Sequence, residues 1–441
     1  MRDLFVLAVV FGSVPVILAR PWIGVLVWSW IAYMNPHRLA WGIARDFPVA
    51  MTVGATTLAA LLLTRDRRPP PLTRETVVLA LFTLWMVVTT FFALEPDPAA
   101  RQLEKVLKIQ LFTFVTMMLI FTRERIHWLV WAIVLSIGFY GVKGGIFTLA
   151  TGGAHRVLGP YGTFIGGNNE IGLAMIMVLP LMRYLQLQAR RVWERNLWWA
   201  AMGLTGIAIL GTHSRGALVG ILAMLAMLAW RTRRKLLFVL ALAALAPAAW
   251  DFMPEKWHAR METIERYEED RSAQGRINAW GFAFNLAKDR PLVGGGFETF
   301  RPRWFLEYAP NPYKVHDAHS IYFEVLGEHG FVGLALFLLL GWFTLRRAGR
   351  IRRLTKGREA LLWAHDLASM IQVSLVGYAV SGAFLGLAYF DLYYALVAIT
   401  VMLGKVVESA RAEEPAPEAA APAPVRPGFP APEGGRSGTR P

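Results

Sequence analysis

The chain has 441 residues, of which 55% are hydrophobic and 17% are charged, and its mean hydropathy is +0.40. This balance is typical of a polytopic membrane protein and excludes a single soluble core. The chain has no cysteine, which excludes a disulfide, a thiolate nucleophile and a cysteine-ligated metal. The formal net charge of +15 lies in short connections between apolar segments, where it sets orientation and does not indicate a nucleic-acid partner.

The apolar segments predict an all-α protein with about twelve transmembrane helices. The first has no small-residue cleavage site, so we expect a retained helix. The segments are 4–34, 48–63, 76–94, 107–121, 127–150, 171–187, 197–211, 216–230, 236–253, 321–345, 360–384 and 388–407. Arg20-Pro21 divides the first segment. One broken span gives twelve helices with the N-terminus inside, whereas two spans give thirteen with the N-terminus outside.

Basic residues alternate between successive connections. The connections 64–75, 122–126, 188–196, 231–235 and 346–359 hold 20 Lys and Arg in total, and the alternating connections hold two at most. The basic set is cytoplasmic by the positive-inside rule, which places 254–320 on the far side. We therefore predict membrane helices in 1–253, an extramembrane loop in 254–320, membrane helices in 321–407 and a tail in 408–441. The tail is rich in Pro, Ala and Gly, which predicts a disordered cytoplasmic C-terminus.

The interval 254–320 is the only long polar stretch between apolar segments. Its aromatic side chains are too numerous to leave in water, so we expect it to be folded and to carry the active site. They are Trp257, Trp280, Phe282, Phe284, Phe297, Phe300, Trp304 and Phe305.

His319 is the first candidate for chemistry, because it lies one residue before the apolar run that re-enters the membrane. An imidazole with an ordinary pKa near ~6.5 can act as a general base for a sugar hydroxyl. The alternative is an interfacial histidine that bonds a loop carbonyl. His316 lies three residues earlier, and Asp317 could orient either ring. A metal site at these three residues has no supporting second pair of ligands, so we favour the base.

Arginine is the second theme. Arg215, in GTHSRG, lies at the same predicted boundary as His319, where a guanidinium could bind a diphosphate or only anchor the helix at the lipid headgroups. Arg276, Arg301 and Arg303 add positive charge to the loop. The loop also holds ten acidic residues against ten basic ones, so many of these charges are expected to form simple ion pairs.

Three weaker signals lie nearby. Asn169 opens a segment as a helix cap or as a polar contact for a sugar, and capping is favoured. Lys143 could reach a phosphate or extend to the headgroups. The glycine triplet 294–296 is more typical of a tight turn than of an anion-binding loop.

These patterns resemble the O-antigen ligase and O-antigen polymerase superfamily of bacterial inner-membrane enzymes. The resemblance rests on the large loop before the tenth span, the SRG at 214–216, GRINAW and PLVGGGFETF, and AHSIYFEVLGEHGFVGL, which is similar to the family's histidine signature. The residue after that histidine is commonly Asn, and here it is Ser320. Residues 20–48 further resemble a subgroup described as O-glycosylation ligases associated with exosortase A systems.

The resemblance implies a C-type membrane glycosyltransferase that needs neither metal nor another cofactor. The donor would be a glycan linked to undecaprenyl diphosphate, and the acceptor a hydroxyl of the lipid A core or of a protein, on the periplasmic face. By motif, His319 is the implied base, and Arg215 and Arg276 the implied diphosphate clamp; His316, Arg301, Arg303, Asn169 and Lys143 are further candidates for binding substrate. The transfer would invert the anomeric centre.

Other functions stay open at this point. A polymerase would use a second lipid-linked glycan as its acceptor. A flippase would also be polytopic and basic, but transporters usually place their polar residues near the bilayer midplane. A structural scaffold would tolerate substitution of His319 and Arg215. The N-terminal stretch favours a ligase.

Overall fold

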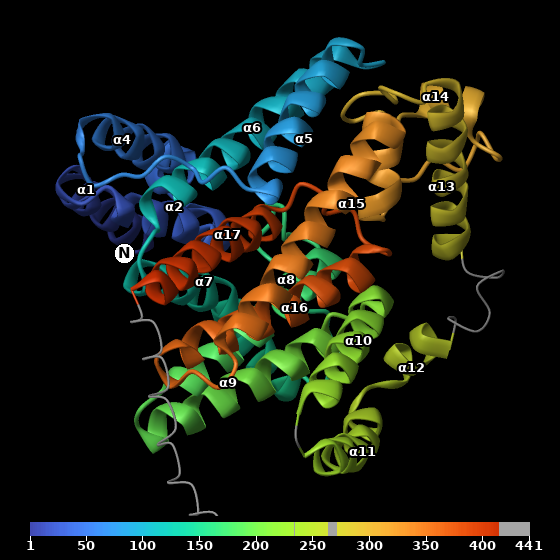
Figure 1. Cartoon of the computed structure of the whole chain (residues 1–441). Coiled ribbons are helices and arrows are strands. Elements are labelled where there is room, and N and C mark those ends of the chain that lie inside the picture. The colour runs from blue at the N-terminus through green and yellow to red at the C-terminus, as the bar shows by residue number, and fades with distance from the viewer. Residues whose placement is uncertain (233, 263–270, 414–441) are drawn as a thin grey trace, which may run out of the picture.

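The computed structural model describes residues 1–232, 234–262 and 271–413, and these ranges are helical with no strand (Figure 1). Eight of the described helices are long and apolar enough to cross a membrane. The chain is therefore a multi-pass membrane protein of the all-α class. The predicted count of twelve spans is not confirmed, because several helices, such as α2 (Trp22–Met34) and α4 (Val49–Leu63), are shorter.

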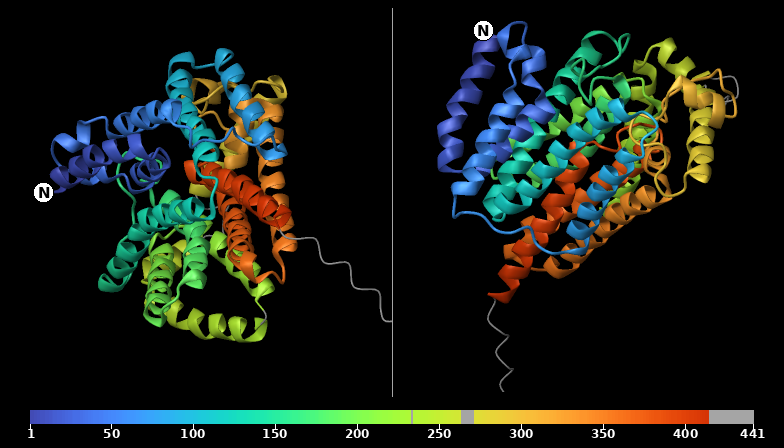
Figure 2. Two further views of the ribbon diagram at one scale, coloured as in Figure 1. Left: turned by 60° about the vertical axis from the view of Figure 1, so that its left-hand side comes forward. Right: turned by 90° about the horizontal axis from the view of Figure 1, so that it is seen from above.

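The first predicted segment forms two helices, α1 (Arg2–Ala19) and α2, which break at Arg20-Pro21. The Asp3 carboxylate at the start of α1 accepts hydrogen bonds from the Gly42 and Ala44 amides at 2.9 and 3.1 Å. This contact places the start of α1 beside the connection after α2, so the two helices form an antiparallel hairpin. The geometry favours two segments over one broken span. Figure 2 shows the hairpin and α4 standing to one side of the other helices.

The remaining elements follow the predicted segments within a few residues at most ends. In chain order they are η1 (Pro36–Leu39), α3 (Ile43–Asp46), α5 (Arg74–Phe91), α6 (Pro96–Leu119), α7 (Arg123–Ala150), α8 (Asn168–Gln188), α9 (Val192–Gly211), α10 (Arg215–Arg231), α11 (Lys235–Phe252), α12 (Glu255–Glu262), α13 (Arg271–Asp289), α14 (Pro302–Tyr308), α15 (Ile321–Thr355), η2 (Glu359–Leu361), α16 (Leu362–Gly382) and α17 (Asp391–Ala412). Helix α6 begins about three turns before the apolar run, because Pro96 at its first position fits a helix start.

Helices α8 and α16 lie at the centre of the bundle. Most residues of α8 between Ile171 and Gln186 are buried, including Pro180, and α16 is buried over most of its length. Together with α7, α9, α10, α15 and α17 they share one continuous apolar core. A helix that is apolar on all sides and surrounded by other helices holds its ends in fixed positions, and several of these ends meet at the site described below.

The described part of 254–320 is folded, as predicted. Helices α13 and α14 pack through Phe282 and Phe305, whose rings stack at 4.4 Å, and both side chains are fully buried. Figure 1 shows α13 and α14 beside one end of α15. Residues 263–270 and 414–441 lie outside the described residues. Helix α17 continues through Ala412, into the stretch predicted as the tail.

Helix α15 is broken at Gly330, whose φ of 66° is left-handed. The segment after α13 fills this break. The amides of Gly295 and Gly296 donate to the carbonyls of Gly327 and Glu328, each at 2.8 Å, and the Phe331 amide donates to the Pro291 carbonyl at 2.9 Å. These bonds satisfy backbone groups that the break releases. The glycine triplet is therefore a structural turn, as expected, and two of its amides are not available to an anion.

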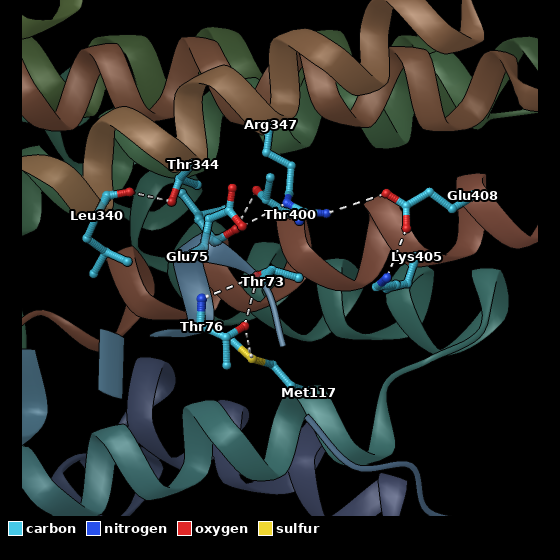
Figure 3. Close-up of polar contacts among 11 residues, drawn as sticks. Thr73, Glu75, Thr76, Met117, Leu340, Thr344, Arg347, Thr400, Lys405 and Glu408 are labelled. Carbon is cyan, nitrogen blue, oxygen red and sulfur yellow. Dashed lines mark hydrogen bonds and ion pairs between the residues drawn. The ribbon is translucent and has the colours of Figure 1, made fainter. Parts of the chain in front are cut away.

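The other end of α15 is fixed by buried charge (Figure 3). The Arg347 guanidinium lies 3.0 Å from the Glu75 carboxylate of α5 and 4.0 Å from Glu408 of α17, and Lys405 lies 3.0 Å from Glu408. Glu75 is 5% exposed. This network joins three helices at the end of the bundle away from His319.

Candidate active site

His319 lies in the loop between α14 and α15, two residues before α15 begins. The Trp280 indole donates to the Ala318 carbonyl at 2.8 Å and stacks on Phe323 at 5.0 Å, which ties the loop to α13 and to the first turn of α15. His319 has a left-handed φ of 40°, a conformation that costs energy for a residue with a side chain. The surrounding contacts therefore hold the ring in a defined position.

Helix α13 brings Arg276 to the same place. The Asn278 side chain bonds the backbone of Asn311 and Lys314 at 2.7–2.8 Å, which holds the loop before His319 against this helix. One turn earlier, Gly275 leaves room for the His316 ring, because a Cβ there would lie 2.8 Å from His316 Cδ2. The His316 and His319 rings are 4.8 Å apart, and His316 Nδ1 donates to the Asp317 carbonyl at 3.0 Å.

Burial and nearby charges together set the protonation of His319. Burial, and then the nearby Arg276 guanidinium and His316, lower the pKa of His319 from its ordinary 6.5 to about 4, whereas Asp317 opposes this shift. The imidazole is therefore neutral at pH 7 and keeps a lone pair to accept a proton. The same shift makes it a weak base until a negative group balances Arg276.

Arg215 is the first residue of α10. The Ser214 hydroxyl caps this helix by accepting from the Ala217 amide at 3.2 Å, and His213, with a left-handed φ of 54°, donates from Nε2 to the Gly153 carbonyl at 2.9 Å. The Asn168 side chain of α8 donates to the Thr212 carbonyl at 2.9 Å. The start of α10 is therefore fixed against the start of α8.

The first turn of α8 also reaches Arg276. The Glu170 carboxylate interacts electrostatically with Arg276 and with Asp317. This turn is thus a common neighbour of the helices that carry the two arginines. Glu170 is a partly buried acid whose charge acts on Arg276.

The connection between α16 and α17, residues 383–390, joins Arg215's helix to His319. A Cβ on Gly216 would lie 3.1 Å from Phe384 Cβ, and one on Gly386 would lie 3.5 Å from Glu324 Oε2 and 3.8 Å from the His319 backbone. The Ala388 amide donates to Glu324 at 3.2 Å.

Glu328 of α15 also joins residues 383–390 and the loop before α14 to α15. Its carboxylate accepts from the Tyr389 hydroxyl at 2.6 Å and from the Glu298 amide at 2.8 Å. Glu324, Glu328 and the 383–390 connection were missed in the sequence. The connection FLGLAYF is short and apolar, without a charged residue or a motif to mark it.

The starts of α8, α10 and α15 are therefore gathered at one end of the bundle. Each helix start carries partial positive charge from its aligned peptide dipoles, which favours anions. With Arg215 and Arg276 on elements that meet here, the arrangement favours an anionic group beside a neutral histidine. The three residues come from α10, α13 and the loop before α15, far apart in sequence.

Other candidate residues have different surroundings. Arg301 forms a local ion pair with Glu298 at 2.7 Å, and the Arg303 guanidinium lies 4.8 Å above the Trp304 ring; both are exposed. Lys143 is exposed on α7, with its amine 5.9 Å from the Phe139 ring, and it lines a groove between α7 and α9. The described contacts do not connect these three residues to His319.

The capping role favoured for Asn169 is wrong. Helix α8 begins at Asn168, its cap is Gly167, and no side chain bonds the cap amides. The neighbouring Asn168 instead uses its amide to reach Thr212. Asn169 lies partly buried in the first turn, so its role as a sugar contact stays a prediction.

Two family comparisons match separate parts of the chain. Residues 200–338 match the family described as O-Antigen ligase, and residues 1–189 match a family of unknown function, DUF5935. Each match covers less than half of the chain, and the first contains Arg215, Arg276 and His319. No curated protein matches the chain. The first match supports the O-antigen ligase superfamily and glycan transfer of the ligase or polymerase type.

Proposed function

We propose that the protein transfers a glycan from a lipid diphosphate carrier to an acceptor hydroxyl at the end of the bundle where His319 lies. The observation that carries this proposal is the meeting of a neutral histidine with Arg276 and the starts of α8, α10 and α15. The donor is undecaprenyl-diphosphate-linked glycan, and the acceptor is a lipid A core sugar or a protein side chain. The match to O-antigen ligases supports this class of donor.

In the proposed reaction His319 takes a proton and the two arginines stabilise the leaving group. The acceptor oxygen forms a bond to the anomeric carbon, its proton passes to His319, and the bond from that carbon to the diphosphate breaks. Undecaprenyl diphosphate leaves with one more negative charge than it had in the donor. Arg276 and Arg215 stabilise this charge and hold the donor in place, a role that elsewhere falls to a divalent metal. Direct attack inverts the anomeric centre.

Donor binding also prepares the base. In the empty site burial, and after it Arg276, lower the pKa of His319. A diphosphate bound at Arg276 compensates its positive charge, so the pKa of His319 rises towards its ordinary value. The histidine thus becomes a stronger base only when donor is present, which limits proton transfer to the productive complex.

The proposed location follows from the alternation of basic connections. We place the protein in the bacterial inner membrane, with His319 facing the periplasm and the C-terminus in the cytoplasm. The start of α1 lies beside residues 42–44, a contact that puts the N-terminus at the His319 end under this topology. The association with an exosortase A system belongs to the same proposal and rests on residues 20–48.

The test is transfer by purified protein in detergent with EDTA, using undecaprenyl-diphosphate glycan as donor. Three acceptors are offered separately: lipid A core, a candidate protein and a second molecule of donor. Product with wild type and not with His319→Ala establishes metal-independent transfer, and the productive acceptor separates a ligase from a polymerase. Absence of product with every acceptor contradicts the proposal, and movement of donor between liposome leaflets would then indicate a flippase.

A further inference from the structure

A lateral groove lies between α7 and α9. Its cavity volume is about 1100 Å³, with α8 as its floor through Met182 and Leu185 and with Trp131 and Trp198 on its walls. This volume slightly exceeds the roughly 300–1,000 Å³ of drug-sized ligand sites. The lining is mainly apolar and opens to the side of the bundle, where membrane lipid lies.

The α9 side of the groove ends after Ala201, where the two helices come into contact. A Cβ on Gly145 would lie 2.1 Å from the Leu204 carbonyl oxygen, and one on Gly141 would lie 2.4 Å from the Thr205 hydroxyl. Helices α7 and α9 therefore touch at this level. Along α7 the lining runs from His127 to Ile146, which covers about 28 Å at 1.5 Å per residue, close to a hydrocarbon core of ~30 Å. The groove is therefore long enough for acyl chains, and its lining contains none of the residues around His319.

The other end of the groove is polar and basic. Arg190 and Arg191 lie exposed at its mouth, beside Gln188. The one acidic lining residue, Glu194, accepts from the Arg190 and Arg191 amides at 3.2 and 3.4 Å. Deeper, His127 accepts from the Trp131 indole at 3.0 Å and contacts the Tyr184 hydroxyl at 3.2 Å through its other nitrogen. The mouth thus offers two guanidinium groups at a membrane boundary.

We propose that this groove binds one anionic glycerophospholipid, with its acyl chains between α7 and α9 and its phosphate at Arg190 and Arg191. Two arginines beside an apolar groove match an anionic headgroup joined to hydrocarbon chains. Under the topology given above, the site faces the cytoplasmic leaflet, which is rich in anionic lipid. The proposed lipid site does not depend on the proposed glycan transfer.

The experiment is native mass spectrometry of delipidated protein titrated with phosphatidylglycerol or phosphatidylcholine of matched acyl chains. We expect one tightly bound phosphatidylglycerol, held roughly 10-fold or more tighter than phosphatidylcholine. Arg190→Ala with Arg191→Ala should remove this preference. Ala201→Trp, which fills the groove from α9, should abolish binding of both lipids. Leu197→Trp is the second blocking variant, because this side chain is 61% exposed and tolerates enlargement.

The matched control removes two basic residues from another connection of the basic set. Arg234→Ala with Lys235→Ala should leave binding unchanged, since both lie at the start of α11, outside the groove. Equal binding of the two lipids by wild type, or unchanged binding in both tryptophan variants, overturns the proposal. Tighter binding of undecaprenyl phosphate than of phosphatidylglycerol, blocked by the same tryptophans, also overturns it and assigns the groove to the carrier lipid.

Discussion

Charged groups lie near both ends of α15, but they differ in how far they are exposed to solvent. At the far end, Arg347 and Glu75 lie 3.0 Å apart with side chains only 16% and 6% exposed, and they join α15 to α5 (Figure 3). At the other end, Arg215, Arg276 and His319 are partly exposed, and the charges of Glu170 and Asp317 act on Arg276 and His319 respectively. A desolvated ion pair can only hold helices together, whereas partly solvated groups can exchange their partners for a substrate. The end of the bundle at Arg347 is therefore expected to be structural, and the end at His319 to be reactive.

The largest effect should come from removing the base. We expect His319→Ala to lower the rate of glycan transfer about 10³-fold, because general bases contribute roughly 10²–10⁴. The initial rate with purified protein measures this, and size-exclusion chromatography checks the fold. The matched control is His316→Ala, whose neighbouring ring bonds a backbone carbonyl. Equal losses of transfer rate in the two variants would contradict the role of His319 as the general base.

The next effect should come from the arginine at the start of α10. Arg215→Lys keeps the charge but loses the forked donors, so we expect transfer to fall roughly 10²-fold. Arg303→Lys is the matched control, because Arg303 is exposed and lies over Trp304. A rate for Arg215→Lys within a factor of two of wild type would mean that Arg215 only anchors the helix.

The far end of α15 should affect stability and leave chemistry alone. We expect Arg347→Met to lower the free energy of unfolding by about 2 kcal/mol, because it leaves Glu75 buried without its cation. The double variant with Glu75→Leu should recover much of this loss. Thermal unfolding measures both, and the transfer rate per folded molecule should stay near that of wild type. A loss of transfer rate per folded Arg347→Met molecule would show that this end of α15 also takes part in the chemistry.

Removing the charge of Arg276 should change the pH profile. Burial and Arg276 hold the pKa of His319 at about 4, and the base must be neutral, so the rate falls as the pH drops through this value. In Arg276→Gln the pKa should rise, and the acidic limb of kcat/KM should move up by about one pH unit. An unmoved limb in this variant, together with a moved limb in His316→Gln, would assign the titration to another neighbour.

The smallest effect concerns Glu170, whose negative charge acts on Arg276 and would repel a diphosphate. We expect Glu170→Gln to lower the donor KM about threefold, which is the scale of a partly exposed ion pair. Donor titrations at saturating acceptor measure this change. A higher KM would show that Glu170 supports the site instead of competing with the donor.

Much of the fold could be predicted from the sequence, because spans and charges are local signals. Apolar run lengths gave most helices within a few residues, and Arg20-Pro21 marked the break between α1 and α2. The folded loop followed from its aromatic residues, which pack as Phe282 and Phe305 do. The break of α15 at Gly330 had no local signal strong enough to predict it, because it depends on the distant segment that fills it.

The candidate site could be predicted only in part. His319, Arg215 and Arg276 were selected by charge, position and resemblance, and the structure gathers the elements that carry them. Lys143 was selected by its position near a helix end, but its rotation about α7 directs it to the groove. The contribution of residues 383–390 could not be predicted, because Gly386 acts by fitting between Glu324 and the His319 backbone. Fits of this kind depend on packing between distant segments.

The most direct test of the two-ended account is binding of undecaprenyl diphosphate, measured without metal for wild type, Arg276→Gln and Arg347→Met. The account predicts that Arg276→Gln weakens binding by roughly 10-fold or more, on the scale of a lost charge-assisted hydrogen bond, while Arg347→Met binds like wild type. Equal affinity in all three proteins, or an equal loss in both variants, would contradict it.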